Sequence, residues 1–134
     1  MTSDARASEL IRAYFRQGWP RVSDVDFDVS GPPEPRGESL VHLQVWSGLN
    51  RAQLGAGRAG WAFVRIWVPL WLQISLTTEL HRAAREVLEG TIIPSDDGRI
   101  QIDEGERMEI GKERMWWMSV VSFPFRFLPG RSPV

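Results

Sequence analysis

Residues 55–60, which read GAGRAG, have the GxGxxG spacing of a phosphate-binding turn. Such a turn binds a pyrophosphate only where a strand enters the glycines and a helix leaves them, because the helix N-terminus holds the anion. Residues 61–69 instead alternate like a strand. The glycines therefore join two strands, and we expect a polar loop over residues 47–60 in place of a nucleotide site.

Two histidines, His42 and His81, could bind a metal or act as a base near neutral pH. A metal site would need both of them and a carboxylate, and no HxH or HExxH spacing supports one. His42 falls on the polar face of an expected strand, and His81 falls in the first turns of an expected helix. We interpret both as solvated or locally hydrogen-bonded side chains, and we predict no metal and no cofactor.

Three aspartates, Asp24, Asp26 and Asp28, have the alternating spacing of the first ligands in a calcium loop. Val29 and Pro35 stand where that loop needs glycine and glutamate. The aspartates also alternate with apolar residues, which favours a short strand with one wet face. The sequence therefore excludes an EF-hand.

The remaining carboxylates and hydroxyls lack a catalytic pattern. The acidic residues of segments 96–98 and 103–106 stand beside glycine, where turn geometry explains them. No serine lies in a GxSxG or SxxK motif, and the chain has no cysteine. We expect no nucleophilic catalysis, no thiolate zinc site and no disulfide.

The composition limits the classes of partner. The 134 residues include 16 basic and 17 acidic side chains, so no overall positive charge draws the chain to nucleic acid. The sequence has neither the apolar core of a signal peptide nor a run of about 18 apolar residues, which predicts cytoplasmic assembly and no membrane span. Seven Trp and six Phe form a heavy aromatic load, which we assign mainly to the core and to subunit contacts.

Hydrophobic periodicity predicts the elements that position these side chains. Helices are expected over residues 3–17, ended by Gly18, Trp19 and Pro20, and over residues 75–89, ended by Gly90. The expected strands are residues 24–29, 40–46, 61–69, 92–93, 99–103, 107–110 and 115–127. The last is more than twice the usual length, so either Pro124 bends it or it reaches beyond its own sheet.

This order of elements has no regular βαβ alternation, which predicts an α+β fold. We expect a single domain over residues 1–134, at a length typical of one domain. Its mainly antiparallel sheet should be covered on one face by two helices, with a long inter-strand loop or arm.

The layout resembles the tail terminator proteins of long-tailed phages and of phage-like gene transfer agents. The likeness covers nearly the whole chain. Its markers are the N-terminal helix, a strand ending near Trp46, Gly48-Leu49-Asn50 before a Gly/Arg-rich connection, Val68-Pro69, the helix from Ser75, Gly90 with Ile92, and the closing Trp116, Val120 and Pro124-Phe125. Two features depart from the pattern: the loop is richer in Gly and Ala, and Leu70-Trp71-Leu72 stand where a polar, glycine-containing turn is expected.

The resemblance implies a structural, non-enzymatic virion protein at the head–tail junction. It implies a homo-oligomeric ring, a hexamer, that caps the tail tube, stops its polymerisation and offers the joining surface for a head-completion or neck protein. DNA would pass through the ring only as cargo. Contacts with a neighbouring subunit or the tube are expected from Asn50, Arg51, Gln53, Leu54 and Arg58. The core or the subunit seam is expected to contain Trp61, Trp67, Trp116 and Trp117.

Two other functions stay open. A small-ligand-binding or enzymatic α+β cone, a helix on a curved sheet, would line an apolar pocket with aromatics and use His42 or one of the three aspartates as a base. A single-stranded nucleic-acid binder would stack bases on the aromatic side chains and lose affinity with salt. The near-neutral charge does not favour the second.

Overall fold

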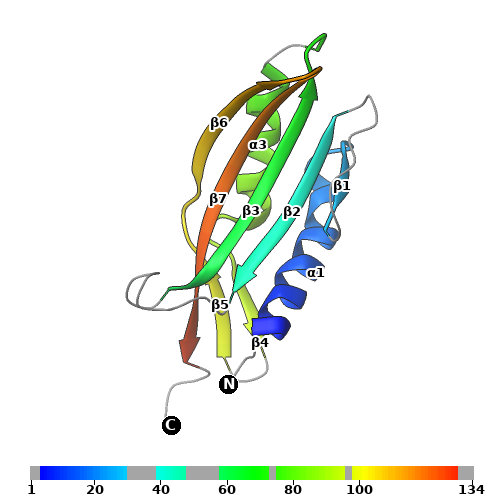
Figure 1. Cartoon of the computed structure of the whole chain (residues 1–134). Helices are drawn as coiled ribbons and strands as arrows, with labels where there is room; N and C mark the ends of the chain where they lie inside the picture. Colours follow the sequence, from blue (N-terminus) through cyan, green and yellow to red (C-terminus); the bar gives the residue numbers. More distant parts are fainter. Residues whose placement is uncertain (1–3, 30–38, 48–57, 73–74, 96–97, 130–134) are drawn as a thin grey trace.

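The computed structural model describes residues 4–29, 39–47, 58–72, 75–95 and 98–129, which form two helices and seven strands (Figure 1). The helices are α1, Asp4–Val22, and α3, Ser75–Leu88. The strands are β1, Asp26–Asp28; β2, Leu40–Ser47; β3, Arg58–Pro69; β4, Ile92–Ser95; β5, Gly98–Ile102; β6, Glu106–Glu113; and β7, Trp116–Pro129. Each expected helix and strand is present, and the bounds of α1 and β6 change most.

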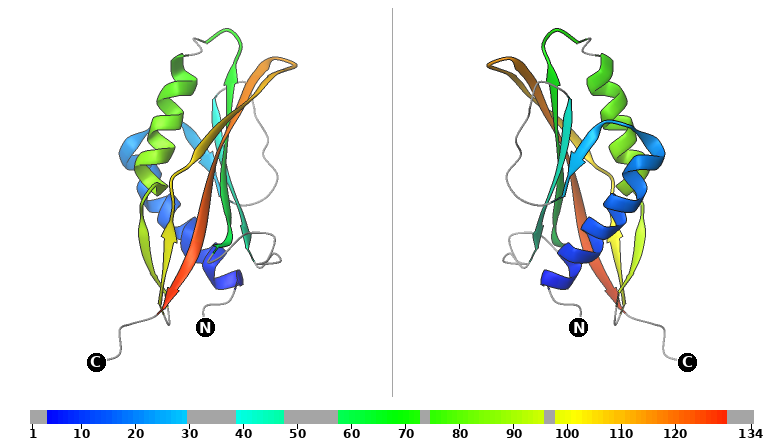
Figure 2. Two further views of the ribbon diagram at one scale, coloured as in Figure 1. Left: turned by 90° about the vertical axis from the view of Figure 1, so that its left-hand side faces the viewer. Right: turned by 90° about the vertical axis from the view of Figure 1, so that its right-hand side faces the viewer.

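A single sheet joins these strands in the order β1-β2-β3-β7-β5-β4, with β6 as a further partner of β7. All pairs are antiparallel except β1 with β2, which is parallel. Both helices lie on the same face of the sheet (Figure 2). The expected α+β class, a mainly antiparallel sheet covered on one face by two helices, is confirmed.

The core lies between the helices and this face of the sheet. Alternate residues of β3 are buried there, as their period of two predicts. Their cross-strand partners on β7 are buried with them, for example Val121 opposite Val64. The helices contribute a matching apolar stripe: Ile11, Phe15 and Trp19 from α1, and Leu80, Ala84 and Leu88 from α3.

β7 is the central strand, because it pairs with β3 along one edge and with β5 and then β6 along the other. It spans two successive partners, which accounts for its length. Pro124 lies inside it, although proline cannot donate to a sheet. The Pro124 carbonyl accepts from Asp103 N–H at 2.8 Å, so the missing donor faces the same edge. That position falls at the junction where pairing passes from β5 to β6.

The expectation that Gly18, Trp19 and Pro20 end the first helix is wrong, because α1 continues to Val22. Trp19 is fully buried, and its ring stacks on Phe15 with 5.4 Å between centroids. Its Nε1–H donates to the Val25 carbonyl at 2.8 Å. This packing outweighs the local stop signals, since propensity is a weak preference that tertiary contacts override.

Gly18 has a packing role in place of the expected breaking role. A Cβ at this position would lie 3.0 Å from Val87 Cγ1, so glycine lets α1 come close to α3. The second helix ends as predicted: Gly90 has a left-handed φ of 71°, which suits glycine after a helix. Its N–H donates to the Ile102 carbonyl at 2.9 Å and so connects the helix end to β5.

Gly105 lies at the junction between β5 and β6. Its N–H donates to Glu89 Oε2 at 2.9 Å, and its carbonyl accepts from an Arg85 guanidinium nitrogen at 3.0 Å. Arg85 and Glu89 also pair with each other at 2.6 Å. A Cβ on Gly105 would lie 2.6 Å from the Phe123 ring, closer than real contacts allow. The junction therefore requires glycine.

Gly105→Ala is expected to destabilise the protein by about 1–3 kcal/mol, because the added methyl overpacks the buried Phe123 ring. The exposed neighbour supplies the matched control: Glu104→Ala should change stability by less than about 0.5 kcal/mol. Urea unfolding of both variants measures the difference. Equal stabilities would contradict the close approach.

Candidate functional site

The GAGRAG segment joins two antiparallel strands, as expected, because β2 ends at Ser47 and β3 begins at Arg58. Both strands reach into the loop expected over residues 47–60: β2 includes Ser47, β3 includes residues 58–60, and Gly60 pairs with Ser47. Arg58 pairs in register with Arg126. The other residues expected to contact a neighbour lie outside the described residues: Asn50, Arg51, Gln53 and Leu54. All five contacts stay predictions.

The four tryptophans expected in the core or at a subunit seam occupy different places. Trp67 is 6% exposed on the outer face, the face of the sheet opposite the helices. Trp61 and Trp116 are half-buried on the same outer face, and Trp117 is half-buried on the helix side. Which of them meets a neighbouring subunit stays a prediction.

His42 is buried on the outer face, so the first of its two expected environments, a solvated side chain, is wrong, and the second, a local hydrogen bond, stays a prediction. It stands on β2 opposite Arg65, and its ring lies edge-on to Trp67 with 6.5 Å between centroids. Large cross-strand neighbours thus cover a position that alternation with Val41 and Leu43 places on the polar face of the strand.

We call a group of three aromatic side chains, at the C-terminal end of β2 and the N-terminal end of β3, the aromatic face. Its members are Trp46, Trp61 and Phe63. Trp46 pairs directly with Trp61 across the two strands. Its ring meets Phe63 edge to face, with 5.2 Å between centroids. Trp46 remains 46% exposed. Protein interfaces use exposed tryptophan of this kind as an anchor.

A second exposed surface, which we call the tip patch, lies beside the C-terminal end of β3. Its members are Leu70, Trp71, Leu72 and Met115. Their exposed fractions are 40, 60, 40 and 60%. The first three lie in the turn after Pro69, and Met115 lies in the turn between β6 and β7 (Figure 1). The Leu70 N–H donates to the Met115 carbonyl at 3.0 Å, so the two turns are held together.

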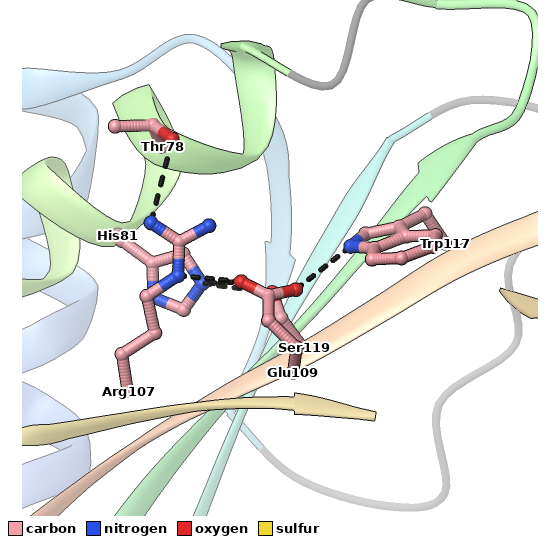
Figure 3. A network of polar contacts seen from close by, with 6 residues as sticks. All are labelled: Thr78, His81, Arg107, Glu109, Trp117 and Ser119. Carbon is pink, nitrogen blue, oxygen red and sulfur yellow. Dashed lines mark hydrogen bonds and ion pairs between the residues drawn. The ribbon is translucent and has the colours of Figure 1, made fainter. Parts of the chain in front are cut away.

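A polar network with a buried centre, His81 and Ser119, joins α3 to β6 and β7 (Figure 3). His81 Nε2 lies 2.8 Å from Ser119 Oγ, and these residues are 3% and 1% exposed. Glu109 accepts from Trp117 Nε1–H at 2.8 Å and from Arg107 Nε–H at 2.5 Å. The six members of the network are Thr78, His81, Arg107, Glu109, Trp117 and Ser119.

The His81–Ser119 pair has the residue types of a nucleophilic triad but a different geometry. In a triad the carboxylate binds the ring nitrogen that does not touch serine. Here Glu109 Oε1 lies 3.9 Å from Nε2, the nitrogen that also contacts Ser119. Within the described part of the chain, Nδ1 has no hydrogen-bond partner. The arrangement therefore favours a structural link between α3 and the sheet.

The pKa of His81 is lowered from 6.5 to about 4, chiefly by burial of the ring. The positive charges of Arg107 and Arg85 contribute to this lowering, and the negative charge of Glu109 opposes it. The ring is therefore neutral at pH 7. Either tautomer can form the hydrogen bond to Ser119, because a hydroxyl both donates and accepts.

An open depression of about 400 Å³ lies beside the end of α1. It contains two of the aspartates considered as a base, Asp24 and Asp26, but not His42. Across the described ranges, no three His, Asp or Glu side chains gather as a metal site. No described helix is long and apolar enough to cross a membrane. Trp19 and Phe27 line the same depression, which is open to solvent where the ligand-binding alternative expects an apolar pocket.

No protein-family model matches the sequence, and neither does any curated protein. A solved structure that carries only an identifier as its name covers 94% of this chain and 97% of its own, at 12% identity and a TM-score of 0.62. A chain of a structure described as the virion of a native gene transfer agent particle covers 90% and 91%, at 14% identity and a TM-score of 0.54. At these identities the likeness shows a shared fold.

Stability is expected to fall as the pH falls from 6.5 toward 4. The unfolded chain takes up a proton at His81 near pH 6.5, whereas the folded protein does so only near pH 4. The unfolded state therefore binds more protons in this window, and His81 alone accounts for a loss on the order of 3 kcal/mol. Urea unfolding between pH 7 and pH 4 measures the slope. His81→Gln, which does not titrate, should flatten it, and an unchanged slope would contradict the assignment.

Proposed function

We propose that this chain is a structural protein of a phage or phage-like particle. The supporting observation is the likeness in fold, over nine tenths of both chains, to a component of a gene transfer agent virion. The order and spacing of the elements, which resemble those of tail terminators, point the same way.

Within such a particle, we place the chain at the head–tail junction as the tail terminator. Copies form a ring, a hexamer, on the end of the tail tube, stop its growth and present a surface to a head-completion or neck protein. DNA passes through the ring as cargo. The described surfaces fit this role, because a ring needs two different patches on each subunit, and the tip patch and the aromatic face are two such patches.

The role is structural and not enzymatic in this proposal. The hydrogen-bonded pair of His81 with Ser119 is closed to solvent and lacks the geometry of a triad. The surface, where large apolar side chains are exposed, carries the function instead.

The first consequence of the proposed role is that the chain associates with other copies of itself and with the tail tube protein. Size-exclusion chromatography with light scattering should show a ring-sized oligomer, either of the chain alone or after mixing with its tail tube protein. Ring formation should depend on concentration, since each subunit loses rotational and translational freedom. A strict monomer under both conditions would count against the proposal.

The segment between β2 and β3 is proposed to contact a neighbouring subunit or the tube through Asn50, Arg51, Gln53, Leu54 and Arg58. Deleting residues 54–57, which lie outside both strands, should leave melting and helical signal largely unchanged and should abolish tail joining. A length-matched control exchanges Gly55 and Gly57 for serine and keeps Leu54. Normal tail joining by the deletion variant would contradict the proposed contact, whereas loss of folding would place the segment in the core.

A further inference from the structure

We infer that the tip patch of one copy of this chain packs against the aromatic face of the next copy. This inference rests on the proposed ring and names its two contacting surfaces. The tip patch carries Trp71 at 60% exposed, and the aromatic face carries Trp46 at 46% exposed. They are the exposed tryptophans of the described chain.

The two surfaces lie at opposite ends of β3 and cannot meet within one molecule. Trp61 belongs to the aromatic face, and Leu70 directly follows the last residue of the strand, Pro69. Between Trp61 and Pro69 the paired strand extends for roughly 27 Å at about 3.4 Å per residue. β3 is held along this length by β2 and β7. Neither surface can therefore cover the other within one molecule.

The size of the tip patch fits a contact between subunits. Trp71 alone exposes on the order of 150 Å², and the four side chains together expose on the order of 400 Å². Because a little over half of an interface is apolar, a patch of this size corresponds to roughly 700 Å² per partner. A stable protein interface needs about 800 Å² per partner.

A second copy is the occupant because it offers the complementary surface. The tip patch consists of two turns that project from the sheet, whereas the aromatic face is part of the sheet surface. Contact between two tips would end at a dimer and leave Trp46 exposed. Contact of tip with face covers both tryptophans and repeats from copy to copy, which closes a ring when the rotation allows it.

Addition of a strand at β6 is a weaker route to assembly. This edge is interrupted by a bulge between Glu109 and Gly111. It is also charged along its length, at Glu106, Arg107, Glu109, Lys112 and Glu113. Bulges and charges of this kind protect an edge from pairing with another chain. The tip patch and the aromatic face are therefore better suited to a contact between copies than the β6 edge is.

Cross-linking tests the pairing, since the chain has no cysteine and single sites can be introduced cleanly. Met115→Cys labels the tip patch, and Gln44→Cys labels the aromatic face, because Gln44 pairs with Phe63 across the strands. Both variants keep every tryptophan. Mixed and treated with a short bis-maleimide, they should form the mixed dimer at least about tenfold more than a control pair of Met115→Cys with Ile92→Cys. Ile92 lies on β4 and is more exposed than Gln44, so a lower yield from the control pair cannot come from poorer access.

The chain carrying both cysteines should give a ladder of cross-linked species that ends at the size of the ring. Equal yield from Met115→Cys alone would show tip-to-tip contact and overturn the inference. A yield no higher than the control pair, from a chain that still forms rings by light scattering, would overturn the pairing and leave the proposed function standing. A chain that never assembles would overturn both.

Replacing either exposed tryptophan by alanine tests the same pairing independently, through the strength of association. Trp71→Ala and Trp46→Ala should each weaken association by about 30-fold, the effect of losing an interface hot spot. Trp71→Ala should melt near the parent temperature, because this side chain is exposed in one copy, and Trp46→Ala should melt about a few degrees lower, because it also loses the ring contact with Phe63. Ile92→Ala is the control and should assemble normally. Unchanged association in both tryptophan variants would overturn the inference.

Discussion

The pairing of β7 on both edges is the constraint on which the rest of the structure depends. One edge is taken by β3, and the other passes from β5 to β6. Only at this junction can the strand accommodate Pro124, and only glycine fits at position 105 beside Phe123. The same junction is bound to α3 through Arg85 and Glu89. Sheet pairing, helix position and the tight turn are thus different consequences of one strand arrangement.

This arrangement also determines which parts of the molecule are available for binding. The helix side of the sheet is closed by apolar packing and by the His81–Ser119 link. The turn from β6 into β7 meets the turn after β3, and together they carry the tip patch. At the other end of β3, the aromatic pairs of β2 and β3 remain partly exposed. A chain of this size that exposes tryptophan at two separate places is suited to head-to-tail assembly.

Local periodicity predicted the fold class, because alternation on β3 and the apolar stripe of α3 reflect burial directly. It failed at Trp19, where stacking on Phe15 and a hydrogen bond to Val25 outweigh the local stop signals. It also failed at His42, which Trp67 covers from the neighbouring strand. The tip patch was visible as apolar residues after Pro69. Met115 belongs to the tip patch because two turns contact each other, and the spacing of residues in the sequence does not predict that contact. The polar network likewise joins residues from three elements.

The central claim is that this chain ends the growth of a tail tube. The most direct measurement is the distribution of tube lengths, seen by negative-stain electron microscopy, in particles assembled with and without the chain. With the chain present, tubes should have one uniform length and a ring at the head-proximal end. Without it, tubes should be overlong and unjoined to heads. Tubes of the same uniform length in its absence would contradict the account.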